Sequence, residues 1–424
     1  MRVLHVITTL APAGAAHQLR LLVRDLPHDC EVATLSRHEA PSRPLIGPIR
    51  AGGTRVHELG SDGEHPLTGV AALRRLIRRG RFDLVHTHLY QATVQGRLAA
   101  GLAGVPGVAT EHAIDDGFDA RPAAGGRWLY LAGERLGGVT IAVSPAVASR
   151  LREWGVPGSR IAVVPKAVDV TEFRYDPALR AAARARLGIA PDATVVGGLG
   201  RLEPGKRFDR LIRAVTDLPD ATLLLVGDGS ARVALERLAE IEGVADRVVF
   251  AGPVGHAREM LCAMDVFASP TDREPSGRQA FGLSVLEAMA AGLPALYATC
   301  PPLERLAAAR AAVRGTRRFS SRDPQSLRRA LRAELLCFEE RRRERLAPRT
   351  AGHRYDAGHV AASVERIYER VGRRRGLIGP ARRRRSSPCA ANTGPATGVP
   401  PASAEPAPAP ALRAGRPGYS TSGR

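Results

Sequence analysis

The chain has 424 residues, and 44% of them are hydrophobic, so it is long enough to form two folded domains with separate cores. Its net charge of +20 is compatible with nucleic acid, an anionic membrane surface or an acidic substrate as partner. No stretch reaches about 18 uninterrupted apolar residues, so any membrane contact would be peripheral. The five cysteines are scattered, without zinc-ligand or secreted-scaffold spacing, and we therefore expect a cytoplasmic protein.

The first part of the chain alternates short apolar runs with amphipathic stretches. This alternation predicts βαβ units and a parallel sheet. The opening apolar run is too short for an export signal and is interpreted as the first strand. The expected strands are residues 3–7, 31–35, 82–86, 139–143 and 161–164, and the expected helices are residues 14–26, 67–79 and 91–103.

The pattern breaks between residues 165 and 187 and then starts again. A second run of alternating elements predicts a second doubly wound α/β domain, with a ligand bound between the two domains at the carboxyl ends of the strands. We place the first domain at residues 1–170 and the second at 171–353. The expected strands of the second domain are residues 193–199, 221–226, 247–251, 265–268 and 294–297, and its helices are residues 207–218, 230–242 and 282–291.

The C-terminal part of the chain differs in composition. A predicted closing helix at residues 354–371 is followed by residues 372–424, which are rich in arginine, proline and alanine and too poor in apolar residues to pack. From Val371 to the end there are ten arginines against one glutamate. We predict a disordered tail, either an electrostatic tether to anionic lipid or nucleic acid, or a solvated segment without a selected role, which its low complexity favours.

Only two of the 62 basic residues are lysines, Lys166 and Lys206. Lys206 lies with Arg201 in a glycine-rich loop between a predicted strand and a predicted helix. Backbone N–H groups, the positive end of the helix and two cations would converge there, an arrangement that suits a diphosphate. The alternative is an ordinary turn whose two cations are solvated.

Three other positions follow predicted strands and could contact a ligand. Gly14 lies among small residues that let the backbone approach a phosphate or sugar. His112 could donate to a sugar hydroxyl, although a lone histidine is more often structural. Glu287 lies in an apolar helix, where a carboxylate needs partners such as ribose hydroxyls or an arginine.

Three aspartates, Asp115, Asp116 and Asp119, lie close together in the sequence and could bind a metal through carboxylates. Aspartates beside glycine are also common in turns, and Arg201 and Lys206 would already neutralise a diphosphate. We therefore predict no metal and no other cofactor.

Residues 269–294 resemble the signature of glycosyltransferase family 4, with Phe281-Gly282 followed by Glu-Ala-Met-Ala-Ala-Gly-Leu-Pro from Glu287. Members are retaining enzymes of the GT-B fold, in which two Rossmann-like domains face each other across a cleft. Other matching motifs occur in the same order at residues 13–16, 86–88, 110–112, 141–144, 200–206 and 225–229.

The resemblance implies a role for each candidate residue. Gly14 would line the donor diphosphate, His112 would contact the transferred sugar, Arg201 and Lys206 would hold the phosphates, and Glu287 would bind the ribose. The implied reaction moves a sugar from a nucleotide diphosphate donor, with uridine as the expected base, to a hydroxyl of a lipid, polysaccharide or small metabolite. The departing phosphate oxygen would draw the proton from the acceptor in a front-face displacement with retention, without a protein nucleophile.

The chain departs from the family pattern at two sites, and its arginine-rich tail has no counterpart in the family core. Gln279 stands where the first glutamate of the Glu-x7-Glu pair is expected, and Glu274 lies five residues earlier, so either could complete the sugar site with Phe281 and Gly282. Lys166-Ala167 replaces the usual Asn-Gly pair.

These departures leave a non-catalytic nucleotide-sugar-binding relative as an alternative function. A nucleic-acid-binding protein acting through its basic tail is a second alternative, but an aromatic content of 4% argues against single-strand recognition and we expect no nucleic acid partner. The basic composition also allows peripheral contact with the anionic inner face of a membrane.

Overall fold

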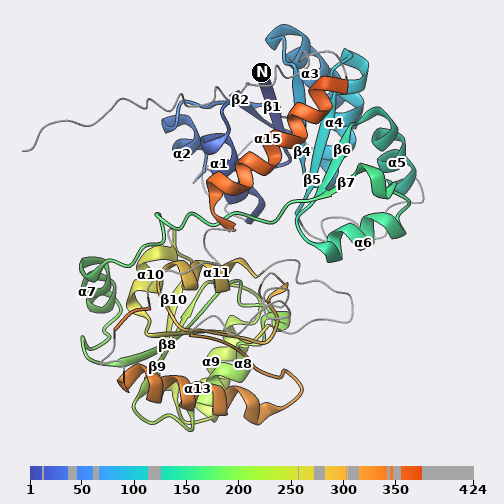
Figure 1. Ribbon diagram of the computed structural model, residues 1–424. Helices are drawn as coiled ribbons and strands as arrows, with labels where there is room; N and C mark the ends of the chain where they lie inside the picture. Colours follow the sequence, from blue (N-terminus) through green and yellow to red (C-terminus); the bar gives the residue numbers. More distant parts are fainter. Residues whose placement is uncertain are drawn as a thin grey trace, which may run out of the picture. The chain divides into compact units, whose positions relative to one another are not determined.

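The computed structural model describes residues 1–11, 14–36, 45–60, 66–112, 126–255, 257–271, 282–301, 303, 315–340, 344–346 and 355–374. It contains two α/β parts, each built on a parallel sheet, which confirms the predicted fold class (Figure 1). Among these residues no helix is both long enough and apolar enough to cross a lipid bilayer.

Within the described residues, the first sheet has seven strands in the order β3-β2-β1-β4-β5-β6-β7, and all neighbours are parallel. The strand order reverses between β1 and β4. At this switch point the connections that follow the two strands run to opposite faces of the sheet. The elements are β1 Arg2–Ile7, α1 Gly14–Asp25, β2 Asp29–Thr34, α2 Ile46–Ala51, β3 Arg55–Glu58, α3 Pro66–Gly80, β4 Leu84–His88, α4 Tyr90–Ala103, β5 Gly107–Glu111, α5 Gly126–Leu136, β6 Val139–Ala142, α6 Pro145–Glu153, η2 Gly158–Arg160 and β7 Ile161–Val163.

The first sheet is buried on both faces, because alternate residues of each strand point to opposite sides. In β1, Val3 and Ile7 pack under α1, α2 and the C-terminal helix α15 (Ala357–Arg374), whereas Leu4 and Val6 pack under α3 and α4. Figure 1 shows α15 running beside α1 across this sheet, and the two helices are in contact. The C-terminal helix is therefore part of the N-terminal core.

The second sheet repeats the same strand order. In the described part of the chain it has six parallel strands in the order β10-β9-β8-β11-β12-β13, so its switch point lies between β8 and β11. The elements are α7 Pro177–Arg186, β8 Thr194–Leu199, η3 Pro204–Lys206, α8 Asp209–Val215, β9 Ala221–Val226, α9 Arg232–Ile241, η4 Ala245–Arg247, β10 Val248–Gly252, α10 Ala257–Ala263, β11 Val266–Ser269, α11 Leu283–Ala290, β12 Ala295–Tyr297, β13 Thr316–Arg318 and α13 Pro324–Glu340.

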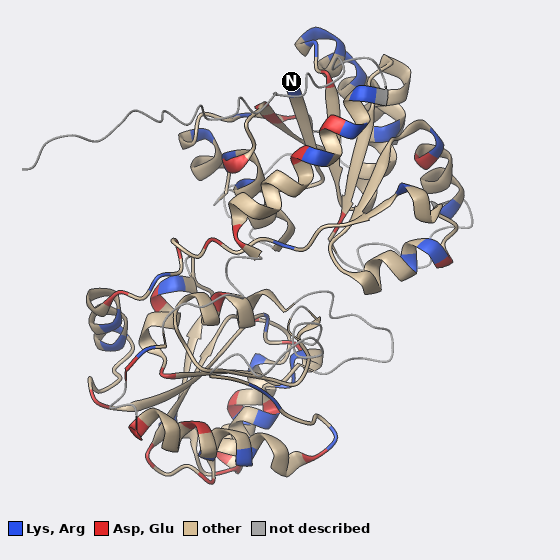
Figure 2. Ribbon diagram, in the orientation of Figure 1, with Lys and Arg blue, Asp and Glu red and all other residues tan. Residues whose placement is uncertain are grey.

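Charged residues lie mainly on the helices and loops, and the strands are mostly uncharged (Figure 2). On one face of the second sheet the core contains residues of α10 and α11, and on the other face it contains residues of α8, α9 and α13. The same alternation holds in β8, where Val195 packs on the face covered by α10 and α11, and Val196 packs on the face covered by α8, α9 and α13.

Several elements differ from the sequence predictions. The strand expected at residues 82–86 lies at Leu84–His88, because Asp83 does not enter the strand and instead accepts the backbone N–H of Arg2 at 2.7 Å. The helix expected from residue 207 is preceded by the short turn η3 and begins at Asp209, because Arg207 has a left-handed backbone with φ 57°. The patterns also missed β3 and β13, which are short and polar.

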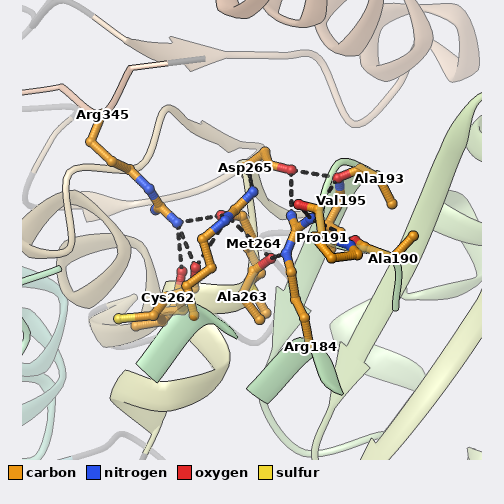
Figure 3. A network of polar contacts seen from close by, with 12 residues as sticks. Arg184, Ala190, Pro191, Ala193, Val195, Cys262, Ala263, Met264, Asp265 and Arg345 are labelled. Atoms are coloured by element: carbon orange, nitrogen blue, oxygen red, sulfur yellow. Dashed lines mark hydrogen bonds and ion pairs between the residues drawn. The ribbon is translucent and has the colours of Figure 1, made fainter. Parts of the chain in front are cut away.

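A network of polar contacts made by arginines connects the helices around β8 and β11 (Figure 3). Asp265 accepts hydrogen bonds from Arg184 at 2.8 Å and from the backbone N–H of Val195 at 2.8 Å, and it also pairs with Arg180 at 2.7 Å. Arg184 donates in addition to the carbonyl oxygens of residues 190, 191, 193 and 263. The single carboxylate thus compensates two guanidinium groups, one of them fully buried.

Asp265→Ala should destabilise the protein by about 3 to 5 kcal/mol, because it leaves the buried guanidinium of Arg184 without a counter-charge. Chemical denaturation followed by circular dichroism measures the change. The control Asp220→Ala alters an exposed aspartate of the same part and should change the free energy of unfolding by about 0.5 kcal/mol or less. A loss below about 1 kcal/mol for Asp265→Ala would contradict this role.

Candidate functional site

The candidate residues that the structure describes lie at the carboxyl ends of parallel strands. Gly14 begins the helix after β1, and His112 follows β5 directly. Arg201 and Lys206 follow β8, and Glu287 lies in the helix after β11. In an open parallel sheet the strand ends beside a switch point are the usual place for a ligand. Gly14, Arg201, Lys206 and Glu287 follow strands that flank the two switch points, and His112 follows β5, the strand next to β4.

Two of the predicted residues line one pocket. The pocket has a volume of about 170 Å³ and is lined by Gly14 and Arg20 of α1, by Glu172 of the segment after β7, and by Leu283 and Glu287 of α11. We call it the Glu287 pocket. Arg20 and Glu172 form an ion pair of 2.5 Å at its wall. The sequence did not single out either residue of this pair.

Glu287 carries the main electrostatic feature of this pocket. Burial raises the pKa of its carboxyl group to about 7, and the negative charge of Glu172 contributes to the rise. A carboxylate with this pKa is poorly solvated, so it gains more from a ligand that donates hydrogen bonds than a surface carboxylate does. Two neighbouring hydroxyl groups are donors of the right kind.

His112 lines a second, smaller pocket of about 30 Å³, together with His88, Thr110 and Lys166. We call it the His112 pocket. This volume is close to the volume that one molecule occupies in liquid water, so the pocket could hold a hydroxyl group. Burial, followed by the positive charge of Lys166, lowers the pKa of His112 well below its ordinary value, and the imidazole is therefore neutral at physiological pH.

Gln18 of α1 lies at both pockets and holds the segment that carries Lys166. Its side-chain amide donates to the carbonyl oxygen of Ala167 at 2.8 Å and accepts the N–H of the same residue at 2.5 Å. The two bonds fix the backbone next to Lys166. Sequence reasoning missed Gln18, although it lies one turn after Gly14 on the same face of the helix.

The loop that carries Arg201 and Lys206 is held against the loop after β9. Leu202 accepts an N–H from Ala231 at 2.8 Å and donates to the carbonyl oxygen of Asp228 at 2.9 Å. Gly227 and Gly229 permit this contact, since a Cβ atom on either would lie 2.0 Å or 2.5 Å from a carbonyl oxygen of the facing loop, and both have positive φ. The loop is thereby fixed by backbone contacts.

Arg201 and Lys206 line neither the Glu287 pocket nor the His112 pocket. The side chain of Arg201 is 75% exposed and pairs with Glu203 at 2.6 Å. Lys206 is the last residue of η3, and the helix that follows, α8, is short and begins with an aspartate. The structure therefore leaves phosphate binding by the two cations as a prediction.

The remaining predicted positions lie outside the described residues. These are Glu274, Gln279 and Phe281 of the polar loop before α11, the aspartates of residues 115–119 and the tail from residue 375 onward. Gly282 is described and is the residue before the first turn of α11.

Among the described residues, one group of three side chains has the spacing of a metal site, namely His5, His86 and His88. The two ring nitrogens of His86 already bond to Tyr368 Oη at 2.5 Å and to Thr110 Oγ1 at 2.7 Å. A metal ion would have to replace these bonds, so we interpret the group as part of a hydrogen-bonded network.

Two models of known protein families match this chain. The model of Glycosyltransferase Family 4 matches residues 12–172, and the model of Glycosyl transferases group 1 matches residues 193–335, so that together they cover more than half of the chain. The chain belongs to glycosyltransferase family 4. The two matches correspond to the two sheets of the structure.

Relatives of this family-4 chain include the D-inositol 3-phosphate glycosyltransferases of Rhodococcus jostii and Streptomyces scabiei. The first is 37% identical over 242 residues, which are 52% of each protein, and the second is 37% identical over 248 residues, which are 52% of this chain and 54% of the relative. The chain thus spans about half the length of the curated relatives it matches.

Solved structures of similar fold include HepE from Anabaena in complex with UDP and a glycosyltransferase from Rickettsia africae. HepE has a TM-score of 0.67 at 21% identity and covers 89% of this chain and 100% of its own. The Rickettsia protein has a TM-score of 0.71 at 15% identity, with 87% and 98% covered. At these identities the comparison establishes the GT-B fold for this family-4 chain.

Glu287→Gln should raise the melting temperature at pH 8 in the absence of ligand. A carboxyl group whose pKa is higher in the folded than in the unfolded state stabilises the fold at low pH, and this contribution is lost between about pH 4.5 and 7. Above pH 7 the buried charge costs roughly 1 to 3 kcal/mol, which glutamine avoids.

The gain from Glu287→Gln should nearly vanish at pH 5, where the native carboxyl group is already neutral. Differential scanning calorimetry at the two pH values measures both changes. Glu240→Gln, on the exposed surface of α9, is the matched control and should leave the melting temperature unchanged. An equal effect of Glu287→Gln at pH 5 and pH 8 would show that its pKa is not raised.

Proposed function

We propose that this chain is a glycosyltransferase that moves a sugar from a UDP-linked donor to an acceptor hydroxyl. The observation that carries the proposal is the Glu287 pocket, which brings Gly14 from the first switch point and Glu287 from the second into one cavity. Gly14 leaves room for the donor, and the poorly solvated carboxylate of Glu287 accepts the two ribose hydroxyls.

The choice of UDP is supported by neighbours of the same fold. HepE from Anabaena is known in complex with UDP, with UDP and glucose, and with UDP-glucose. The donor sugar would extend from the Glu287 pocket toward the His112 pocket, since Gln18 and Ala167 line both. His112 would then contact the transferred sugar.

The acceptor is inferred from the curated relatives, which are named for D-inositol 3-phosphate. We therefore place a hydroxyl of a small phosphorylated polyol first among the acceptors, ahead of a lipid or a polysaccharide. With a lipid acceptor the protein would act as a peripheral protein at the inner face of the membrane, since no described helix could cross it.

The proposed chemistry is retaining and independent of metal. Arg201 and Lys206 would turn toward the diphosphate and stabilise the negative charge that builds on the leaving group. The departing phosphate oxygen would take the proton of the acceptor hydroxyl as the new glycosidic bond forms on the same face of the sugar. The chain itself would supply binding, orientation and exclusion of water.

A thermal-shift screen of the full chain tests the donor assignment. UDP and UDP-sugars should raise the melting temperature by several degrees at saturating concentration, because they bind the native state, whereas GDP, ADP and TDP should have little effect. Turnover is then measured as release of UDP with inositol phosphate, lipid and oligosaccharide acceptors. If no nucleotide stabilises the protein, the proposal is wrong. If UDP-sugar binds without UDP release, the chain is a non-catalytic relative.

Lys206→Ala should lower kcat/KM for the UDP-sugar at least tenfold, which corresponds to about 1.4 kcal/mol of lost transition-state stabilisation. The melting temperature should hardly change, because Lys206 lies in a surface turn. Arg213→Ala also removes one positive charge from the same part of the protein, from an exposed pair with Glu242, and should leave kcat/KM unchanged. Near-normal turnover of Lys206→Ala would remove this residue from the mechanism.

A further inference from the structure

A line of hydrogen-bonded histidines leads from the His112 pocket into the core of the first sheet. His112 Nε2 lies 3.1 Å from His88 Nδ1, and His88 Nε2 lies 3.2 Å from His5 Nδ1. All three side chains are buried, with 4%, 1% and 0% of their surface exposed. Buried imidazoles in such a line are rare enough in an apolar core to need a reason.

The register of the sheet produces this line. His5 is paired with His86, so His88 lies two residues further along on the neighbouring strand β4. His88 is in turn paired with Thr110, so His112 lies two residues further along again, past the end of β5. Steps of two residues keep every side chain on the same face of the sheet, so each histidine reaches the next toward the carboxyl edge.

His86 lies beside this line without joining it. Its two ring nitrogens bond to Tyr368 of α15 and to Thr110, and its ring centroid lies 4.3 Å from that of His88. This packing limits the orientations that the His88 ring can adopt.

The three imidazoles are neutral, so each carries one N–H. Burial is the largest cause that lowers the pKa of each one. The next cause is repulsion by a neighbouring positive charge, which is that of a protonated His88 for His5, of a protonated His112 for His88, and of Lys166 for His112. The line therefore contains three N–H groups but only two hydrogen bonds between rings, and each bond uses one N–H. The third N–H remains at an end of the line. That end is either His5 Nε2 or His112 Nδ1.

The two ends differ in what surrounds them. Neither His5 Nε2 nor His112 Nδ1 has a hydrogen-bond partner among the described residues. His5 lies fully inside the core, where an orphaned N–H is rarer than an orphaned acceptor, whereas His112 lines a pocket that can receive a hydroxyl group. Protons on the Nδ1 atoms of all three rings leave the spare N–H at the pocket.

We propose that His88 is a positioning residue which, backed by His5, holds His112 in the Nδ1–H tautomer, so that His112 presents a hydrogen-bond donor to the sugar. The inference rests on the proposed function, in which His112 contacts the transferred sugar. It adds that the group facing His112 must be an acceptor, such as a hydroxyl or carboxylate oxygen of the sugar. His112 touches the substrate, and His88 acts through it.

The first test reads the tautomer directly and needs neither donor nor turnover. The full chain is labelled with 15N-histidine, and His112→Gln assigns the resonances of His112. We expect a pyrrole-type 15N shift for Nδ1 and a pyridine-type shift for Nε2 of His112. The reverse pattern in the wild-type protein would overturn the inference. This result is independent of the proposed function, which fails instead if UDP-sugars neither bind nor react.

The second test uses a matched set of variants at position 88. An asparagine amide lies close to the place of Nδ1, so His88→Asn can still donate to His112, whereas a glutamine amide lies near Nε2 and His88→Leu offers no donor. We expect His88→Asn to keep kcat within about threefold of wild type, and His88→Gln and His88→Leu to lose about tenfold or more, with KM changed little.

Melting temperatures and the 15N spectra accompany these rates, so that a folding defect is recognised. In His88→Leu the Nδ1–H tautomer of His112 should no longer be fixed, and in His88→Asn it should persist. Equal kcat values in all three variants, or loss of kcat in His88→Leu with an unchanged His112 tautomer, would contradict a positioning role.

Discussion

The hydrogen bonds among the buried imidazoles of β1, β4 and β5 are the interactions on which our account of the site depends. Polar side chains beneath the carboxyl edge of a sheet covered on both faces must find partners inside the protein. His5, His88 and His112 do so by bonding to one another, and His86 does so by bonding to Thr110 and to Tyr368. The C-terminal helix α15 thereby takes part in building the site of the N-terminal part.

The second part contributes a rigid platform with one poorly solvated group. The Asp265 network and the backbone contacts permitted by Gly227 and Gly229 fix the loops around β8 and β11. Glu287 is the exception, since its buried carboxyl group has a raised pKa and costs stability when ionised. Such a cost is expected at a binding site where the hydrogen-bond donors for a carboxylate are supplied by the ligand.

The sequence predicted the two doubly wound parts because alternating apolar runs are a strong signal, and it pointed to Glu287 because a carboxylate stood in an apolar helix. It could not predict the histidine line, since the pairing of His5 with His88 and of His86 with Tyr368 depends on strand register and on a helix 282 residues away in the chain. Gln18 escaped notice for the same reason, because its partner Ala167 lies 149 residues further on. The role of Arg201 as a phosphate ligand stays a prediction, and in this structure its exposed side chain pairs with Glu203.

The most direct test of the central claim is a crystal structure of the full chain with UDP-glucose. Our account predicts the ribose hydroxyls within hydrogen-bond distance of the Glu287 carboxylate, the diphosphate between Gly14 and the loop that carries Lys206, and a sugar oxygen within hydrogen-bond distance of His112 Nδ1. A donor bound elsewhere, or a sugar that presents only donor or apolar groups to His112, would contradict it.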